Sequence, residues 1–484
     1  MARRCLVVVG VLAAVGGCAR LSPEAQVVQD AATALGGRAA VEGVAVLTIE
    51  GTGRQFNLGQ DLRPGLAEQT FAVRAYTREY DLTAPRLRVT QTRTPNFAYF
   101  QGPQAQTQSQ GVDGDIAYNA SNGGRPTRAA VAVAAERRVE RYHHPLVLVR
   151  AALAANARLS LDGLPVGLVR EGERGIAVDT ADGRLFLVLD AGSHPVRIVS
   201  KGTHPNLGDV LLTTTFANYA AAGGLQLPTR ITTAVDDFTT GEYEVASRVA
   251  GGGALAAPAE AASAEPPAGA VNIVVTEEAP GVWLLAGQSH HSVVVAFTDR
   301  LVMIEAPQSE ARALAAIARA RELRPGTPLT HLVMTHHHFD HSTGLRAAIA
   351  EGLTIVTQEG NADFVRETAA RPATIAPDAL ARSPKPVTVE TVGASTTISD
   401  GTRTLALYHV AGNPHSETML MAHLPAERLL IEVDAFSPGG SYHPYAANLL
   451  EHVERLNLRV NRILPLHGAP APYSDLVAAA RSAS

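Results

Sequence analysis

A short segment of the C-terminal half carries the densest group of potential metal ligands, Thr335-His336-His337-His338-Phe339-Asp340-His341. The apolar run 332–334 precedes it, so the segment is expected on a loop between a strand and a helix. His336 and His338, two residues apart on a turn, can direct their imidazoles to one ion. Asp340 and His341, at the start of the helix, can face a second ion. The spacing therefore predicts a centre for two metal ions.

Histidine and carboxylate are the ligand types that the chain offers for such a centre. Of its 17 histidines, four precede residue 250 and 13 follow residue 271. Its two cysteines, Cys5 and Cys18, both lie in the first 18 residues, so no thiolate ligand is expected in the mature chain. We therefore expect the histidine-based chemistry after residue 271.

The region after residue 271 alternates strands with helices, which is typical of an α/β domain. The hydrophobic pattern predicts a helix at 309–323 and strands at 282–285, 292–297, 301–304, 330–335, 418–422 and 429–433. The metal-binding segment follows one of these strands directly. A strand-to-helix loop of a layered domain is therefore expected to hold the chemistry.

On these residues, the region from about Val275 to the C-terminus resembles the metallo-β-lactamase fold superfamily. The resemblance implies a four-layer αβ/βα sandwich that carries its metals at one edge. It also implies three further ligands, and the chain has them in the expected order. His415, in Gly412-Asn413-Pro414-His415-Ser416, matches the third histidine of the first ion. Asp434 matches the aspartate that bridges both ions, and His467, in Leu464-Pro465-Leu466-His467-Gly468, matches the last histidine of the second ion. The predicted ligand set is His336, His338, Asp340, His341, His415, Asp434 and His467.

The chain departs from the family pattern after the strand at 301–304, where Glu305-Ala306-Pro307 replaces the usual aspartate-led turn. Glu305 is expected either to support a metal ligand or to lie on the surface. His337, between two ligands, is expected to point away from the metals. Structural roles are expected for four other histidines, His331, His409, His423 and His452.

The resemblance implies a zinc-dependent hydrolase with two Zn2+ ions, and iron or manganese would also fit these ligands. A hydroxide held between the ions would attack the substrate, one ion would polarise its carbonyl or phosphoryl oxygen, and Asp340 would orient the nucleophile as the catalytic residue. The expected substrate is a small molecule of the ester, lactone, thioester or lactam type. Two loops provide candidates for its pocket, His290, His291, Tyr442 and His443.

Three other functions remain open at this point. The chain could be a β-lactamase, although a bridging Asp434 resembles the lactonase, thioesterase and esterase members more than the dedicated β-lactamases. It could be an iron-dependent persulfide dioxygenase, whose reaction does not need all seven ligands. It could also be a non-enzymatic lipoprotein that carries a lipid or another ligand.

The sequence pattern of residues 24–249 predicts a β-rich α+β accessory domain. It precedes the hydrolase domain at 272–484. Strands are expected at 71–80, 185–189, 196–199 and 210–216, and a helix over 128–157 is expected to break at His143-His144-Pro145. The strand spacing resembles lipoprotein-sorting half-barrels that hold acyl chains, while an accessory domain without a cavity fits equally well. The Ala/Pro/Gly-rich stretch 250–271 is expected to be a linker.

Residues 1–18 have the basic start and short apolar core of an export signal. Val15-Gly16-Gly17-Cys18 resembles a bacterial lipobox, so Cys18 is the expected lipidation site, and an ordinary secretory signal is the alternative. Ala19-Arg20 then favours the periplasmic side of the outer membrane. The formal charge of -5 and pI near 6.4 weigh against a nucleic-acid partner and favour a small-molecule substrate. The sequence indicates no particular oligomeric state.

Overall fold

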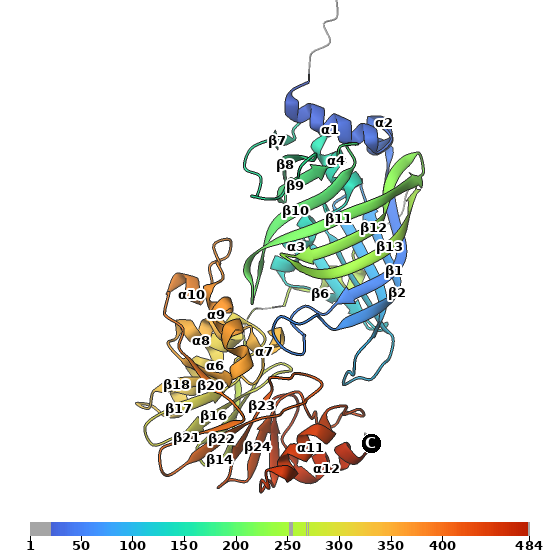
Figure 1. Cartoon of the computed structure of the whole chain (residues 1–484). Coiled ribbons are helices and arrows are strands. Elements are labelled where there is room, and N and C mark those ends of the chain that lie inside the picture. The colour runs from blue at the N-terminus through green and yellow to red at the C-terminus, as the bar shows by residue number, and fades with distance from the viewer. Residues whose placement is uncertain (1–20, 251–254, 268, 270, 483–484) are drawn as a thin grey trace, which may run out of the picture.

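The computed structural model describes residues 21–250, 255–267, 269 and 271–482 (Figure 1). The predicted signal segment and Cys18 lie outside these residues. Two large regions follow each other along the chain, a β-rich region up to residue 250 and an α/β region from residue 274. In the described part of the chain, no helix has the length and apolar character needed to cross a membrane.

The N-terminal region is built on a 13-stranded sheet in which every pairing is antiparallel. One meander runs from β1 to β6 and another from β7 to β13, and β1 pairs with β13 so that Val46 lies opposite Ala250. The strands are β1 Val46–Phe56, β2 Thr70–Asp81, β3 Arg86–Pro95, β4 Gln106–Asp113, β5 Ile116–Ser121, β6 Thr127–Arg128, β7 Arg158–Ser160, β8 Arg174–Thr180, β9 Gly183–Leu189, β10 Pro195–His204, β11 Gly208–Ala222, β12 Leu225–Val235 and β13 Phe238–Ala250.

Four helices accompany this sheet, α1 Pro23–Ala34, α2 Arg38–Gly43, α3 Val131–Glu140 and α4 Pro145–Ala152. The helix predicted over 128–157 is two helices, and the chain breaks at His143-His144-Pro145 as expected, because Pro145 fits only the first turn of a new helix. Figure 1 shows the sheet curving around α3 and α4. Leu146 and Leu148 of α4 are fully buried in the same core as Leu47 and Leu187 of the sheet.

The curved sheet lines an open cavity of about 1030 Å³. Strands from both meanders and helix α3 line it, and many of its side chains are amides or hydroxyls, such as Gln55, Gln91, Gln108 and Thr233. Of the two alternatives for this region, the one with a cavity agrees with the structure. Within the predicted linker, the described residues 255–267 contain helix α5 (Ala259–Ser263), which buries Ala261, and Ala257 N donates to Asp113 Oδ2 of the sheet.

The C-terminal region contains two mixed sheets. The first sheet has β14 Val274–Ala279, β15 Val282–Ala286, β16 Ser292–Ala296, β17 Leu301–Ile304, β18 Leu329–Val333, β19 Thr354–Gln358 and β20 Val389–Val392. The second has β21 Ser395–Ser399, β22 Thr404–His409, β23 Leu420–Leu424, β24 Leu429–Glu432, β25 Arg462–Pro465 and β26 Ala471–Pro472. The predicted α/β class is confirmed.

The hydrophobic core joins the two sheets, and it includes Val293 and Val302 of the first sheet and Leu407 and Leu420 of the second. Another buried cluster packs α6 (Glu310–Leu323) and α8 (Leu345–Ala350) against the first sheet. Helices α11 (Ala446–Arg455) and α12 (Tyr473–Ser482) pack with the second sheet. The remaining helical segments are α7 Phe339–Ser342, η1 Glu359–Asn361, α9 Ala362–Ala370 and α10 Ala379–Arg382.

The strand directions explain where the predicted ligands meet. Strands β17 and β18 run parallel in the first sheet, and β24 and β25 run parallel in the second. The carboxyl ends of parallel strands lie at the same edge of a sheet, where α/β proteins commonly place their sites. The two sheets also meet there, since Leu420 N donates to Thr335 O at 2.8 Å.

Candidate metal centre

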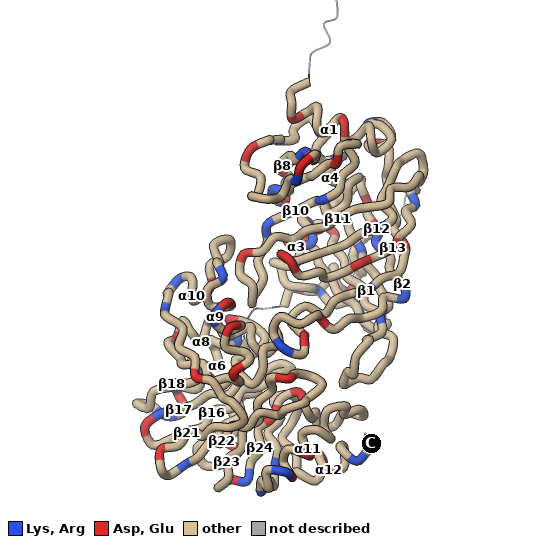
Figure 2. Tube along the Cα trace, in the orientation of Figure 1, with Lys and Arg blue, Asp and Glu red and all other residues tan. Residues whose placement is uncertain are grey.

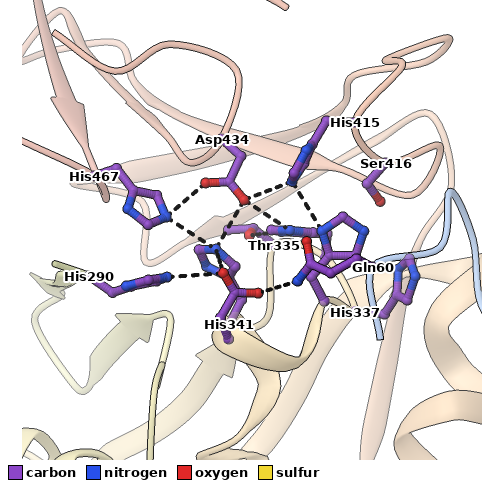
Figure 3. Close-up of polar contacts among 12 residues, drawn as sticks. Gln60, His290, Thr335, His337, His341, His415, Ser416, Asp434 and His467 are labelled. Carbon is purple, nitrogen blue, oxygen red and sulfur yellow. Dashed lines mark hydrogen bonds and ion pairs between the residues drawn. The ribbon is translucent and has the colours of Figure 1, made fainter. Parts of the chain in front are cut away.

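Two groups of four potential ligands converge at this edge, and a third group, Glu305, His336 and His341, overlaps both (Figure 3). In each group the candidate ligand atoms lie within 4.8 Å of one another. The first group is His336, His338, His415 and Asp434, and the second is His290, Asp340, His341 and His467. The structure thus brings all seven predicted ligands together and adds His290. Their roles as ligands stay a prediction.

The first group surrounds a nitrogen that has no hydrogen-bond partner. His336 is fully buried, and its Nε2 lies 3.3 Å from Asp434 Oδ2 without forming a hydrogen bond to any described residue. His415 Nε2 lies 3.0 Å from His338 Nδ1 and 2.9 Å from Asp434 Oδ2. Nitrogen lone pairs that converge on a carboxylate oxygen fit a shared cation.

Asp434 reaches both groups. Its Oδ1 lies 2.8 Å from His467 Nε2, while its Oδ2 lies 3.0 Å from His341 Nε2 and 2.9 Å from His415 Nε2. Its side chain is 6% exposed. Burial opposes the charge of this carboxyl, but the His341, His467 and His415 imidazoles hold its pKa well below its usual range. The arrangement fits the bridging role that the resemblance implied.

Outward-facing acceptors fix three of the imidazoles. His338 Nε2 donates to Asp61 O at 2.9 Å, and His467 Nδ1 donates to Ser289 O at 3.1 Å. His341 Nδ1 lies 3.2 Å from Glu305 Oε2. Each contact leaves the opposite ring nitrogen facing the cluster, as acceptors behind metal-binding histidines do.

Glu305 is a buried support, so the expectation of a surface position was wrong. Its side chain is fully buried, and its carboxylate also accepts from Thr335 N at 2.8 Å and from the Thr335 hydroxyl at 2.5 Å. Glu305 has φ +65°, a conformation that costs a side chain on the order of 1 kcal/mol or more. These bonds, with Glu305 N donating to Val333 O, hold it there.

Burial sets the protonation of His336. Burial, with help from His341, lowers the pKa of His336 to about 4, so its imidazole is neutral at pH 7. Burial also opposes the charge of His341, but Asp434 and Asp340 raise the pKa of His341 well above its usual range. A bound cation would take the place of that proton, because a metal ligand must be deprotonated.

His290 is the clearest addition to the predicted set, since it was expected only at the pocket rim. Its Nε2 lies 3.2 Å from Asp340 Oδ2, and its ring lies 4.0 Å from that of His467. Ser289 Oγ contacts its Nδ1 at 2.9 Å, and Arg312 Nη2 donates to its backbone oxygen at 2.5 Å. No known motif spacing connects His290 to the segment 336–341, so the sequence did not predict His290 as a metal ligand.

The other rim candidates do not join the two ligand groups. His443 Nε2 donates to Gly440 O within its own loop, and its ring packs on Phe436. Tyr442 is 37% exposed, and His291 N donates to Leu466 O at 2.9 Å. The histidines expected to be structural bond elsewhere: His331 to Thr330, His409 to Glu417 O, His423 to Arg459 O and His452 to Asn448 O.

Two residues of the N-terminal region reach the centre, and sequence analysis missed both. Gln60 Nε2 donates to Asp340 Oδ1 at 2.7 Å. Asp61 accepts from His338 through its backbone oxygen, and its Oδ1 lies 3.0 Å from His337 Nε2. His337 therefore points away from the ligand groups, as expected. Asp61 and His337 are 276 residues apart, and no local motif marks Gln60 or Asp61.

The residues present fit metal ions. The donor set consists of imidazole nitrogens and carboxylate oxygens, which suits zinc and also iron or manganese. The convergence of four imidazoles, those of His336, His341, His415 and His467, on the Asp434 carboxylate gives this fit its sharpest support. Asp340 has a 44% exposed side chain, so a small solute can approach the centre from that side.

Comparisons with known proteins give matches among solved structures alone. No protein-family model matches the chain, and no curated protein matches it. Among solved structures, the DIM-1 metallo-β-lactamase is 15% identical, with 44% of this chain and 98% of that chain covered and a TM-score of 0.36.

A metallo-β-lactamase from Pontibacter korlensis is 18% identical over 43% of this chain and 98% of its own, with a TM-score of 0.35. The rubredoxin oxygen:oxidoreductase of Desulfovibrio gigas is 18% identical over 43% of this chain and 60% of its own, with a TM-score of 0.34. The two mixed sheets, their helices and the ligand edge agree with the α/β class predicted for the C-terminal region.

Proposed function

We propose that the chain is a zinc-dependent hydrolase whose C-terminal region holds two metal ions. The observation that carries the proposal is that two ligand groups meet at one buried carboxylate, Asp434. His336, His338 and His415 would hold one ion, and Asp340, His341 and His467 the other, with His290 in reach of the second. The proposal includes a four-layer αβ/βα arrangement, which the packing of α6 and α11 supports.

Bound zinc would supply a Lewis acid and a water acidic enough to act as a nucleophile near neutral pH. The chain supplies the positioning. Asp340 has one carboxylate oxygen held by Gln60, and its other oxygen faces His290 and the ligand cluster. It can therefore orient a water by accepting a hydrogen bond. Burial opposes its charge, but His341 and His290 lower the pKa of Asp340, so it stays an acceptor at neutral pH.

A small ester, lactone, thioester or lactam is the proposed substrate. Aromatic rings of Phe100 and Tyr445 lie 6.2 Å and 5.1 Å from the His415 ring, so an apolar part of the substrate can pack beside the first group. Figure 2 shows acidic and basic residues interspersed along both regions. This distribution supports a small molecule over a nucleic acid.

A hydrolysis screen tests the proposal. Purified full-length protein would be assayed on a β-lactam, an acyl-homoserine lactone, a thioester, and phosphate and sulfate esters. Zinc-dependent turnover of one carbonyl substrate, lost on chelation and restored by zinc, is the expected result. Oxidation of a persulfide by an iron-loaded protein would replace the hydrolase with the dioxygenase. Co-purified acyl ligand with no turnover would favour the carrier.

We also propose, on sequence grounds, export through residues 1–18 and a lipid anchor at Cys18. A cysteine at this position has no disulfide partner after the signal is removed, since Cys5 lies within the signal. Cys18→Ser should move the protein from the membrane fraction to the soluble periplasmic fraction. Unchanged membrane fractionation would contradict the anchor.

A further inference from the structure

The loop between β1 and β2, residues 57–69, joins the N-terminal region to the metal centre, and we call it the bridging loop. Figure 1 shows this blue segment next to α7. We propose that the bridging loop is a working part of the metal centre, with Gln60 and Asp61 as positioning residues. This inference rests on the proposed function, because it takes the two ligand groups to be metal sites.

Gln60 fixes the carboxylate of Asp340. The amide Nε2 donates to Oδ1 at 2.7 Å, and this leaves Oδ2 facing His290 and His341 at 3.2 Å and 3.6 Å. Asp340 is the most exposed of the predicted ligands, with a 44% exposed side chain. A hydrogen-bond donor behind the ligand therefore matters most at Asp340, because it determines which carboxylate oxygen faces the ion.

Asp61 fixes the imidazole of His338. Its backbone oxygen can only accept, so His338 Nε2 carries the proton and Nδ1 presents its lone pair toward His415 Nε2, 3.0 Å away. The Asp61 carboxylate contacts His337 Nε2 at 3.0 Å. One residue thus holds two successive side chains of the segment 336–341. The bridging loop contacts ligands from both groups, His338 in the first and Asp340 in the second.

The bridging loop is fitted to this position. Gly59 has φ +74°, and a Cβ at this residue would lie 2.2 Å from the Phe339 ring. Gly59 O accepts from Phe339 N at 3.1 Å, and Leu62 O accepts from Glu417 N at 2.7 Å. The loop therefore attaches on one side to the start of α7 and on the other to the segment that carries His415. Its own backbone is tied by Glu68, which accepts from Gly59 N and Gln60 N.

Contacts outside the bridging loop also hold the two regions together. Asn206 Nδ2 donates to Ser342 Oγ at 2.8 Å, and Asp209 accepts from Thr374 N at 2.9 Å and Ile375 N at 3.0 Å. Asp209 does not contact a predicted ligand in the described structure. Asp209→Asn is therefore a matched control that perturbs the interface without touching the centre.

The experiment measures zinc affinity of the full-length protein by competition with a chromophoric chelator. Gln60→Ala should weaken one zinc equivalent by roughly 10-fold to 100-fold and leave the other within about threefold. Gln60→Glu keeps the size of the side chain but loses the donor, so it should weaken the same equivalent at least as much. A role in packing alone would predict that Gln60→Glu behaves better than Gln60→Ala.

Gly59→Ala should weaken both equivalents, because the clash with Phe339 displaces Gln60 and Asp61 together. Thermal melting would show whether each variant is folded, and Gln60→Ala decides the question if Gly59→Ala does not fold. Zinc affinities within twofold of wild type for folded Gln60→Ala, or losses matched by Asp209→Asn, would overturn the inference. A wild-type protein that binds no zinc would instead overturn the proposed function, and this inference with it.

Discussion

Each region buries a histidine whose pKa is lowered by burial, but the two histidines have different partners. Burial lowers the pKa of His143 to about 3 in the N-terminal region, and its Nδ1 and Nε2 pair with Thr214 Oγ1 and Ser200 Oγ at 3.0 Å and 2.9 Å. Burial lowers the pKa of His336 to about 4, yet its Nε2 is unpaired among the described residues. His144 Nε2 of the N-terminal region is also buried and unpaired, so the convergence of several imidazoles on Asp434, more than burial, a lowered pKa or an unpaired nitrogen, marks the candidate site.

The open pocket of the N-terminal region shows the same pairing of polar groups. In the N-terminal cavity, Gln91 Nε2 donates to Gln55 Oε1 at 2.9 Å, and Arg93 Nη1 donates to the same oxygen at 2.8 Å. These side chains have hydrogen-bond partners within the chain, as His143 has.

Removing the shared carboxylate should have the largest effect. Asp434→Ala takes a ligand from both groups and should abolish detectable hydrolysis while the fold is retained, because the neighbouring β24 side chains form the core. Asp340→Ala should also lower turnover by about 100-fold or more, through a misplaced nucleophile. The two losses should not add in the double variant. Turnover measurements and circular dichroism check this prediction. An active Asp434→Ala variant would contradict the role of Asp434 as a carboxylate shared by both ligand groups.

His337→Ala is the control on the same loop, since His337 faces Asp61 and Thr418 and not the ligand groups. It should keep both zinc equivalents and most of its activity. If His337→Ala lost all activity while it kept both metals, His337 would have to be assigned a direct role in the reaction.

His290→Ala sharpens the distinction between a ligand and a neighbour. Loss of the imidazole next to Asp340 should weaken one zinc equivalent by roughly 10-fold, as loss of a supporting or weakly coordinating group does. His291→Ala, one residue along the same loop, should leave zinc binding unchanged. Chelator competition distinguishes the two variants, and equal affinities would place His290 outside the metal site.

His143→Gln tests the buried histidine of the N-terminal region, whose two ring nitrogens both have partners. It should leave zinc binding intact and destabilise the fold by about 1–3 kcal/mol if Thr214 or Ser200 loses its partner. The pKa of His143 falls from 6.5 to about 3 on folding, so the stability that it contributes is present above pH 6.5 and is lost as the pH falls below that value. Denaturant unfolding at several pH values should show a weaker acid dependence in the variant.

Glu68 should give the smallest effect. Burial, with help from the charge of Asp61, raises the pKa of Glu68 from 4.5 to about 7, so ionising it disfavours the folded bridging loop. The stability that it contributes is present below pH 4.5 and is lost as the pH rises through about 7. Glu68→Gln should therefore gain thermal stability relative to wild type as the pH rises from about 5 to about 8. A difference that does not change with pH would contradict this assignment.

The sequence predicted the parts of the centre that depend on local spacing. The segment 336–341 is a continuous motif after a buried strand, and His415, Asp434 and His467 each follow a recognisable turn or strand in family order. Whether Glu305 supports a metal ligand or lies on the surface depends on its burial, and burial follows from tertiary packing. Strands β10 and β11 extend past the predicted 196–199 and 210–216, because their polar ends continue the ladder without an apolar pattern.

Gln60, Asp61 and His290 could not be predicted, because their roles come from tertiary contacts. Gln60 lies 280 residues from Asp340, and its loop has the glycine and proline of an ordinary turn. His290 looks like any polar loop residue until β15 and β16 place it beside α7. Such contacts depend on how the regions pack, and no short-range pattern records them.

Metal stoichiometry tests the central claim most directly. Elemental analysis of full-length protein purified without chelator should find about two zinc per chain, and the same preparation of Asp434→Ala should hold clearly less. Two equivalents that fall in the variant would agree with two ligand groups that share one carboxylate. A reproducible single iron in the wild type, or zinc content unchanged by Asp434→Ala, would contradict the account.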